Sequence, residues 1–179
     1  MINAMFATDE ANGMGFDGKL PWPHNKEDMR WFKSHTAGDV VVMGRKTWEG
    51  GMPKPLPGRL NWVVTASTLK TDQANAFLDK GASGVWNNSP IALVRWLNEK
   101  HRDRTIWVIG GATLLQSMAG FFDRVYHTKI TGTYECDTFL DPLAMLSGYE
   151  SIYKDAREGA EFNIYAKLSR LDEKDPPGR

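Results

Sequence analysis

The most restrictive feature of this sequence is a pattern that occurs twice, in which a short apolar run stops at glycine. Residues 39–43 lead into Gly44, and residues 105–109 lead into the pair Gly110 and Gly111. Both runs are too uniformly apolar for a strand with one wet face, and such runs are typical of parallel strands that helices cover on both sides. The pattern therefore predicts an α/β fold with a mostly parallel central sheet.

The remaining elements follow from apolar runs, helix caps and breaker residues. We expect strands at residues 2–7, 39–43, 60–66, 84–86, 105–109 and 124–130, a short extended piece at 137–140, and a terminal antiparallel pair around 151–153 and 162–168. Helices are expected to begin at Asn25 and at Ser89, because both side chains can cap a helix and Pro90 suits a first turn. Residues 50–59 hold three prolines and three glycines, which predicts a stiffened loop.

Length and charge exclude several classes of protein. The 179 residues suit one domain over residues 1–170, with a flexible charged tail at 171–179. Lysine plus arginine and aspartate plus glutamate both number 22, so the sequence gives no electrostatic reason to expect a nucleic-acid or membrane partner. No signal peptide or membrane-length apolar run is present, which favours a cytoplasmic protein. Cys136 is the only cysteine, so neither a disulfide nor a cysteine metal cluster is expected.

An acid stands out in the stretch at 18–33, where a loop rich in glycine and proline enters a short amphipathic helix. Helical spacing places Asp28, Trp31 and Phe32 on one face, which is apolar except for that carboxylate. Two interpretations of Asp28 remain open at this point. It can cap the start of the helix, or it can line a pocket and hold a cationic or protonatable ligand.

The glycine ends of the two apolar strands offer an anion site. Arg45 and Lys46 follow Gly44, whereas Gly110 and Gly111 form only part of a dinucleotide fingerprint, so each segment alone is weak evidence. Together they place glycine turns and two cations at one sheet edge, which suits a dinucleotide with an extra phosphate such as the 2′-phosphate of NADP. The sequence shows no nucleophile–histidine arrangement and no metal spacing, which favours a redox enzyme whose cofactor brings the hydride.

Five motifs occur in a specific order. They are Leu20-Pro21-Trp22 with Asp28 and residues 31–33, and then residues 42–49, 56–61, 108–111 and 137–138. With these motifs the chain resembles dihydrofolate reductase along almost its whole length. The resemblance implies a single α/β domain with a central eight-stranded, mostly parallel sheet, an antiparallel C-terminal strand and about four flanking helices. It also implies reduction of 7,8-dihydrofolate by NADPH to tetrahydrofolate, by a monomer that binds a small-molecule substrate.

The resemblance assigns roles to residues of the substrate site. Asp28 would bind the pterin ring and promote protonation of N5 while hydride passes to C6, with Thr128 bonded to it and Trp22 as a further catalytic residue. The substrate-binding residues would be Asn3, Met5, Leu20, Phe32, Leu56, Arg59 and Ile109. Among these, Phe32 and Leu56 would enclose the rings, Arg59 would hold the glutamate carboxylate, and the carbonyls of Asn3 and Ile109 would meet the pterin amino group.

The resemblance also implies a cofactor site without a metal. Its residues would be Ala7, Asn12, Gly44, Arg45, Lys46, Thr47, Thr65, Ser67, Gly110, Gly111, Ala112, Thr113, Leu114 and Leu115. Residues 12–24 match the mobile loop that closes over the nicotinamide. Leu115 stands where many family members carry a tyrosine near the nicotinamide, and this departure is expected to slow hydride transfer. Met5 and Asn12 also replace smaller or more apolar residues.

Two alternatives to this enzyme remain. A related reductase of riboflavin synthesis shares the fold and NADPH, but it would need neither Asp28 nor Arg59. A binding protein that has kept the fold and lost turnover is favoured only by Leu115.

Overall fold

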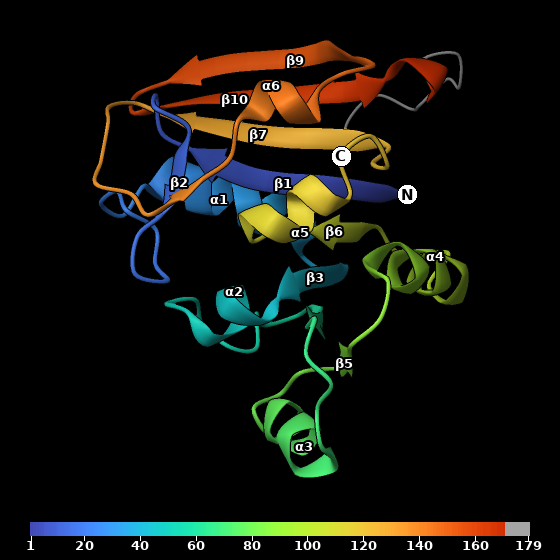
Figure 1. The fold of residues 1–179 in the computed structure, drawn as a ribbon. Helices are drawn as coiled ribbons and strands as arrows, with labels where there is room; N and C mark the ends of the chain where they lie inside the picture. Colours follow the sequence, from blue (N-terminus) through green and yellow to red (C-terminus); the bar gives the residue numbers. More distant parts are fainter. Residues whose placement is uncertain (171–179) are drawn as a thin grey trace.

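The computed structural model describes residues 1–170, which form an eight-stranded sheet in the order β5-β4-β3-β6-β1-β7-β10-β9 (Figure 1). The strands are β1 (Ile2–Thr8), β3 (Val40–Gly44), β4 (Leu60–Val64), β5 (Gly84–Trp86), β6 (Ile106–Val108), β7 (Arg124–Ile130), β9 (Tyr149–Arg157) and β10 (Ala160–Lys167). Six strands from β5 to β7 pair in parallel, and β10 runs antiparallel to both of its neighbours. The predicted sheet is confirmed, and the expected tail at 171–179 lies outside the described residues.

The helices number more than expected. They are α1 (Lys26–Thr36), α2 (Arg45–Glu49), α3 (Thr71–Asp79), α4 (Pro90–Lys100), α5 (Ala112–Ser117) and α6 (Pro142–Met145), followed by a 3-10 turn at Leu168–Arg170. Neither α3 nor α6 was predicted from the sequence. In α3 only Phe77 is buried, so the segment lacks the repeated apolar spacing that identifies a helix. No helix within residues 1–170 is long and apolar enough to cross a membrane.

Capping side chains fix the start of the two longest helices. The Asn25 side chain accepts a hydrogen bond from the backbone N–H of Asp28 at 3.0 Å, and Ser89 accepts one from Ala92 at 3.4 Å. Gly38 has φ 83°, a left-handed conformation that favours glycine just after α1. Both predicted helix starts are therefore confirmed.

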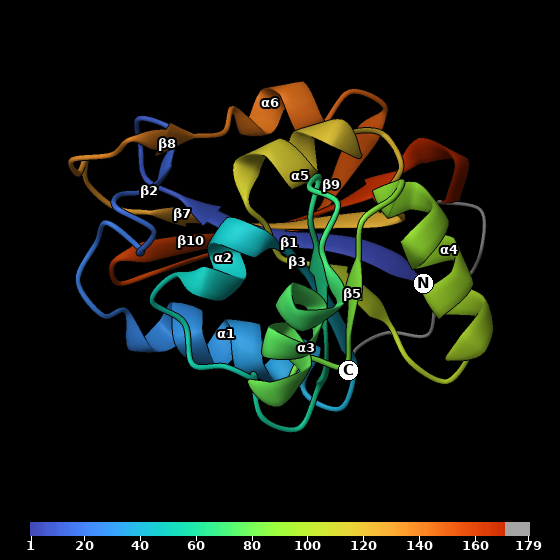
Figure 2. The same cartoon turned by 60° about the horizontal axis from the view of Figure 1, so that its bottom comes forward.

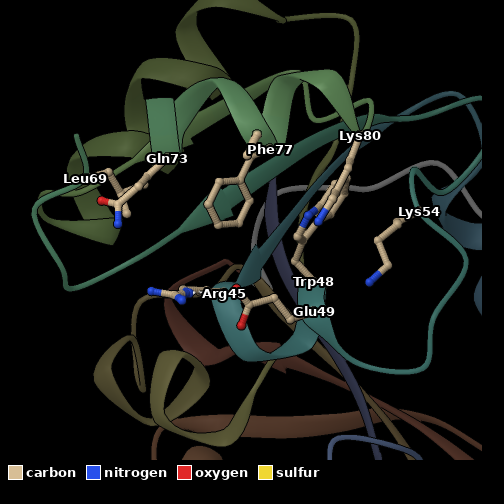
Figure 3. Close-up of a pocket in the computed structure, with 9 residues that line it drawn as sticks. Arg45, Trp48, Glu49, Lys54, Leu69, Gln73, Phe77 and Lys80 are labelled. Atoms are coloured by element: carbon tan, nitrogen blue, oxygen red, sulfur yellow. Dashed lines mark hydrogen bonds and ion pairs between the residues drawn. The ribbon is translucent and has the colours of Figure 1, made fainter. Parts of the chain in front are cut away.

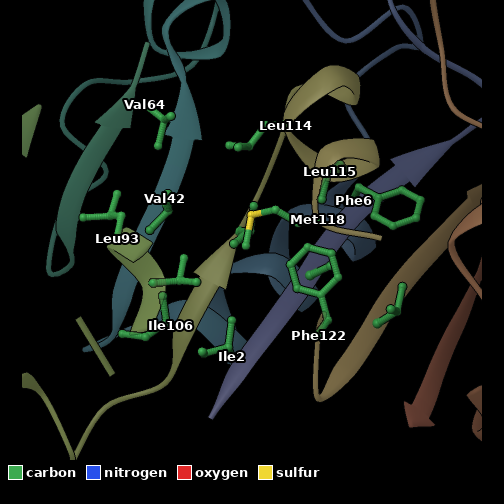
Figure 4. Close-up of a cluster of buried hydrophobic side chains, with 14 of the residues drawn as sticks. Ile2, Phe6, Val42, Val64, Leu93, Ile106, Leu114, Leu115, Met118 and Phe122 are labelled. Carbon is green, nitrogen blue, oxygen red and sulfur yellow. The ribbon is translucent and has the colours of Figure 1, made fainter. Parts of the chain in front are cut away.

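The sheet is covered on both faces, as its apolar strands predict. Figure 2 shows α1 and α3 on one side and α5 and α6 on the other. Along β3, Val40 and Val42 enter the core beneath α4 and α5, whereas Val41 and Met43 enter the core beneath α1 and α3. Figure 4 shows part of the first of these cores. Full burial of one such side chain stabilises the fold by about 1.5–3 kcal/mol, so the four buried side chains of residues 40–43 fix the position of Gly44 at the end of β3.

A second, two-stranded sheet lies outside the main one. It pairs β2 (Gly13–Gly15) with β8 (Thr138–Phe139) in antiparallel fashion. From the sequence, only a loop was expected at the first of these segments and a short extended piece at the second. The pairing joins the segment that follows β1 to the segment that follows β7, and both segments leave the same edge of the main sheet.

Candidate active site

The predicted site residues converge on the edge of the sheet where the parallel strands end. Ala7 near the end of β1 pairs with Thr128 on β7, and Gly44 ends β3. The backbone N–H of Gly44 donates to the carbonyl of Gly110 at 2.7 Å. The two glycine turns that the sequence places at one edge are therefore in direct contact.

Asp28 occupies the third position of α1 and is 9% exposed. Its backbone N–H is bound by Asn25, so the cap of this helix is Asn25 and not Asp28. The Asp28 carboxylate instead makes a side-chain hydrogen bond with Thr128. Burial raises the pKa of Asp28 above its ordinary value, and the Thr128 hydrogen bond offsets this only in part. The geometry favours the second interpretation, in which the acid serves a site.

Aromatic side chains of α1 flank this acid. Trp31 packs against Phe162 of β10, with ring centroids 4.9 Å apart, and Phe32 packs against the core on the same side of the sheet. The predicted shared face of Asp28, Trp31 and Phe32 is confirmed, because Trp31 and Phe32 are half-buried and Asp28 is buried beside them. The environment of the carboxylate is therefore poor in water.

The loop before β4 delivers Leu56 and Arg59 to the end of α1. The Asn61 side chain accepts from the N–H of Leu56 at 2.9 Å, and it donates to the carbonyls of Leu56 at 3.0 Å and Arg59 at 2.9 Å. Asn61 belongs to the motif at residues 56–61, but no role was predicted for it from the sequence. A buried amide beside a loop rich in proline and glycine is the kind of residue that fixes such a loop.

Only some of the N–H donors of the Arg59 guanidinium are bonded within the protein. Its Nη1 donates to Thr36 Oγ1 at 2.9 Å, its Nε donates to the carbonyl of Pro57 at 3.1 Å, and its centre lies 5.7 Å from the ring centroid of Phe32. Partial desolvation lowers the pKa of Arg59, but a guanidinium stays charged. It has donors left for a carboxylate next to Phe32.

Residues 12–24 run from the small sheet towards the glycine turns. Asp137 accepts from the N–H of Asp17 at 2.8 Å through its carboxylate, and its own N–H donates to the carbonyl of Gly15 at 3.0 Å. Further along, the N–H of Gly51 donates to the carbonyl of Gly18 at 3.2 Å. Within this segment Trp22 is buried, whereas Leu20 is 51% exposed. The segment thus lies across the ends of the strands with few buried side chains.

The residues predicted for the cofactor divide into several groups. Gly44 and Gly111 precede α2 and α5, and neither helix start has a side-chain cap. A Cβ added at Gly111 would lie 3.3 Å from Thr47 Oγ1, so this turn has little room for a larger residue. The exposed Arg45 pairs with Glu49 at 2.8 Å. The uncapped starts of α2 and α5 and the exposed cations Arg45 and Lys46 fit a dinucleotide phosphate.

The other residues predicted for the cofactor site take the following positions. Ala7 is half-buried near the end of β1, Asn12 has φ 65° and Lys46 is exposed, Thr65 is buried next to exposed Ser67, and Ala112 and Thr113 open α5. Thr65 Oγ1 accepts from the N–H of Ser67 at 3.2 Å. Residues 1–170 contain no group of three or more histidine, cysteine, aspartate or glutamate side chains that could hold a metal ion.

Two residues predicted for the substrate, Asn3 and Met5, lie on β1. Asn3 pairs with Trp107 and Arg124 in the first half of the strand, four residues before Ala7. Ala4 pairs with Val108, so the next residue of β1, Met5, is level with Ile109 across the sheet.

Leu115, which was predicted for the cofactor site, lies on α5 with a buried side chain. Together with its neighbour Leu114, it belongs to the hydrophobic core in Figure 4, near Phe6, and it is fully buried. Residues on one short helix point in different directions, which sequence alignment with a motif does not reveal.

A separate cavity of about 280 Å³ lies between α2 and α3 (Figure 3). Its lining residues are Arg45, Trp48, Glu49, Lys54, Leu69, Gln73, Ala76, Phe77 and Lys80. The cavity shares Arg45 with the predicted cofactor residues, but it contains none of the residues predicted for the substrate. We therefore assign the chemistry to the Asp28 region and not to this cavity.

Comparison with known proteins agrees with this geometry. The family model described as Dihydrofolate reductase matches residues 1–170. Dihydrofolate reductase type 8 from Escherichia coli is 33% identical over 150 residues, which are 83% of this chain and 85% of that protein. Dihydrofolate reductase from Bacillus subtilis is 36% identical over 137 residues, which are 76% of this chain and 73% of that protein.

A solved structure extends the agreement to the whole fold. Dihydrofolate reductase from Enterococcus faecalis, in a complex with NADP(H) and RAB-propyl, superimposes with a TM-score of 0.73 at 27% identity. The similarity covers 93% of this chain and 95% of that one. The chain therefore belongs to the dihydrofolate reductase family.

Proposed function

We propose that this chain reduces 7,8-dihydrofolate to 5,6,7,8-tetrahydrofolate with NADPH, by hydride transfer to C6 and protonation of N5 assisted by Asp28. The observation that carries the proposal is the buried hydrogen-bonded pair of Asp28 and Thr128 at the end of the parallel strands. Family membership supports the reaction, and this pair supports the role of the acid.

Asp28 acts on the substrate through both of its protonation states. A carboxylate in a site poor in water makes strong charge-assisted hydrogen bonds with a protonated ring. Its raised pKa brings its proton affinity closer to that of a substrate nitrogen near neutral pH. Thr128 holds the carboxylate in one orientation, and Trp22 helps to exclude water from this side.

The substrate lies between α1 and the loop before β4 in this proposal. Phe32 and Leu56 enclose its rings, and Arg59 binds the glutamate carboxylate with its free guanidinium donors. For the pterin amino group we propose the carbonyls of Met5 and Ile109 and not that of Asn3, because of the strand register. Leu20 covers the substrate from the loop at 12–24.

NADPH supplies the hydride when it is bound, and the chain positions it. Gly44, Gly110 and Gly111 allow a close approach to its phosphates. Arg45 and Lys46 bind the 2′-phosphate, for which multidentate cations are suited. The remaining predicted cofactor residues, Ala7, Asn12, Thr47, Thr65, Ser67, Ala112 and Thr113, surround the dinucleotide, whereas Leu114 and Leu115 support it from the core.

The proposal is tested by the absorbance of NADPH at 340 nm. We expect purified protein to consume NADPH only when dihydrofolate is present, and to use NADH far less well. Equal use of the two cofactors would remove the role given to Arg45 and Lys46. If absorbance does not fall when dihydrofolate is added, the proposed reductase activity is overturned.

A second reductase reaction, on the ribosylamino-pyrimidine of riboflavin synthesis, shares the fold and the cofactor. Nothing in that substrate calls for a buried acid on α1 or for Arg59 beside Phe32, so the site favours dihydrofolate. We further propose that the enzyme works as a monomer in the cytoplasm. Sedimentation of the purified protein checks the first point, and cell fractionation checks the second.

A further inference from the structure

A second buried acid, Asp9, takes no part in the chemistry proposed above. It follows β1 directly and is only 1% exposed. No role for Asp9 was predicted from the sequence. A buried carboxylate outside the reacting groups needs a physical reason, because its burial is costly without partners.

The two oxygens of Asp9 bind two different segments. Oδ1 accepts from the N–H of Ala11 at 2.9 Å and from the N–H of Gly13 at 2.8 Å, which closes the turn that leads into β2. Oδ2 accepts from the N–H of Tyr134 at 2.9 Å, and the thiol of Cys136 lies 3.8 Å away. One side chain thus ties the start of the loop at 12–24 to a segment 125 residues later.

These hydrogen bonds keep Asp9 ionised. Burial alone would raise the pKa of Asp9, but the three backbone N–H groups and the thiol outweigh it and hold the pKa below its ordinary value. Bonds from N–H groups to a charged carboxylate are about twice as strong as neutral ones. The connection between the two segments is therefore strong for a contact between loops.

The surrounding backbone reinforces this connection. The N–H of Glu10 donates to the carbonyl of Gly132 at 3.0 Å, beside the link to Tyr134. A Cβ at Gly13 would come within 2.3 Å of Cys136 Sγ and 3.2 Å of Asp9 Oδ1, so the turn packs tightly on the later segment. From here β2 pairs with β8, which places Asp9 at the base of the small sheet.

We propose that Asp9 is a positioning residue that anchors the base of the loop at 12–24, so that this loop lies correctly over the reactants. The inference rests on the proposed function, because it gives the loop the task of covering the cofactor and substrate. Asp9 touches neither of them. It acts through the turn at its Oδ1 and through Tyr134 at its Oδ2.

Two variants remove the long-range bond and keep most of the turn. Asp9→Asn has one oxygen for Ala11 and Gly13, and its NH₂ group then faces the N–H of Tyr134. Asp9→Ser can accept within the turn and is too short to reach Tyr134. We expect both variants to fold and to lower kcat about tenfold, as expected for the loss of one charge-assisted bond that orders the reactants, with KM for dihydrofolate changed less than about twofold. The deuterium isotope effect on kcat with 4-deuterated NADPH should rise, because slower hydride transfer limits turnover more fully.

Asp39→Asn is the matched control. Asp39 also joins distant segments, since it accepts from the N–H of Thr105 at 3.1 Å and from the indole N–H of Trp107 at 2.9 Å. It lies before β3, at the opposite end of the parallel strands from Gly44. This substitution should leave kcat and the isotope effect unchanged.

Hydrogen exchange gives a readout without substrate or cofactor. In the Asp9 variants the amides of residues 10–24 and 131–138 should exchange about tenfold faster or more, and those of β3 and β4 should not change. Unchanged exchange at 10–24, an equal loss of kcat in Asp39→Asn, or failure of both Asp9 variants to fold would each overturn the proposal. If the wild-type protein shows no reductase activity, the proposed function fails, whereas the exchange result still decides whether Asp9 anchors the loop.

Discussion

Two regions of the molecule each bury an aspartate, and they treat its charge in opposite ways. The turn after β1 surrounds Asp9 with three backbone N–H donors and a thiol, and the pKa of its carboxyl is lowered. The start of α1 offers Asp28 a single hydroxyl group, Thr128, and the pKa of its carboxyl is raised. The deeper burial of the Asp28 carboxyl and its poorer supply of hydrogen-bond donors together give the two acids opposite pKa shifts.

The difference distinguishes Asp9, whose carboxylate stabilises the fold, from Asp28, whose carboxylate can still accept hydrogen bonds from a ligand. Asp9 has used its lone pairs on the protein, so nothing is left for a ligand. Asp28 retains acceptor sites in a water-poor place, which costs folding free energy and suits a ligand that brings its own donors. Because its pKa is raised, the cost of Asp28 is present at neutral pH and disappears as the pH falls through that raised pKa towards 3.8.

The largest expected effect follows from removal of the charge at Asp28. Asp28→Asn keeps the shape and can still bond Thr128, but it cannot ionise. We expect kcat near neutral pH to fall by about 10²–10⁴, which is the usual worth of a proton-transfer group. Stability should stay the same or rise by about 0.5–2 kcal/mol, because a costly buried charge is removed. A much lower melting temperature for the variant than for the wild-type protein would contradict this, because it would show that Asp28, like Asp9, stabilises the fold.

His127 extends the comparison to a buried base. Like Asp28 it has one hydroxyl partner, since its Nε2 lies 2.9 Å from Thr8 Oγ1. Burial, with help from the charge of Lys129, lowers the pKa of His127 to about 4. The folded protein thus keeps His127 neutral, whereas the unfolded chain protonates it near 6.5.

Stability should therefore decline as the pH falls from about 6.5 to about 4, by up to about 3 kcal/mol from this group. Urea unfolding of the wild-type protein and of His127→Gln at pH 7, 5.5 and 4.5 measures the difference. The variant should show a shallower decline. Parallel curves for the two proteins would mean that His127 keeps an ordinary pKa in the folded state.

The sequence predicted the main sheet because its strands are short, uniformly apolar and bounded by glycine. The same reasoning found α1 and α4, since Asn25 and Ser89 are strong caps. It missed α3, whose exposed polar surface carries only one buried side chain, Phe77. A local sequence pattern predicts an element only when the spacing of its apolar residues reflects their burial in the fold.

The candidate site was predictable where a residue type is costly or unusual in its place. Asp28 interrupts an apolar face, and Arg59 ends a stiff loop. Asp9 was not predictable, because its value depends on the N–H of Tyr134, which no local pattern connects to it. The choice between Asn3 and Met5 for the pterin contact depends on strand register, which is a property of the sheet and not of the motif.

Arg59 provides the smallest and most specific test of the idea that spare bonding capacity marks a ligand-binding charge. Two of its five N–H donors bind Thr36 and Pro57, and the rest remain for a carboxylate. Arg59→Lys keeps the charge but loses the two-pronged geometry, so KM for dihydrofolate should rise about tenfold with kcat nearly unchanged. Arg30→Lys is the control, because Arg30 is exposed and pairs only with Glu27 one turn earlier among the described residues. An unchanged KM in Arg59→Lys, or an equal rise in Arg30→Lys, would show that free donors on a partly buried charge do not identify the substrate contact.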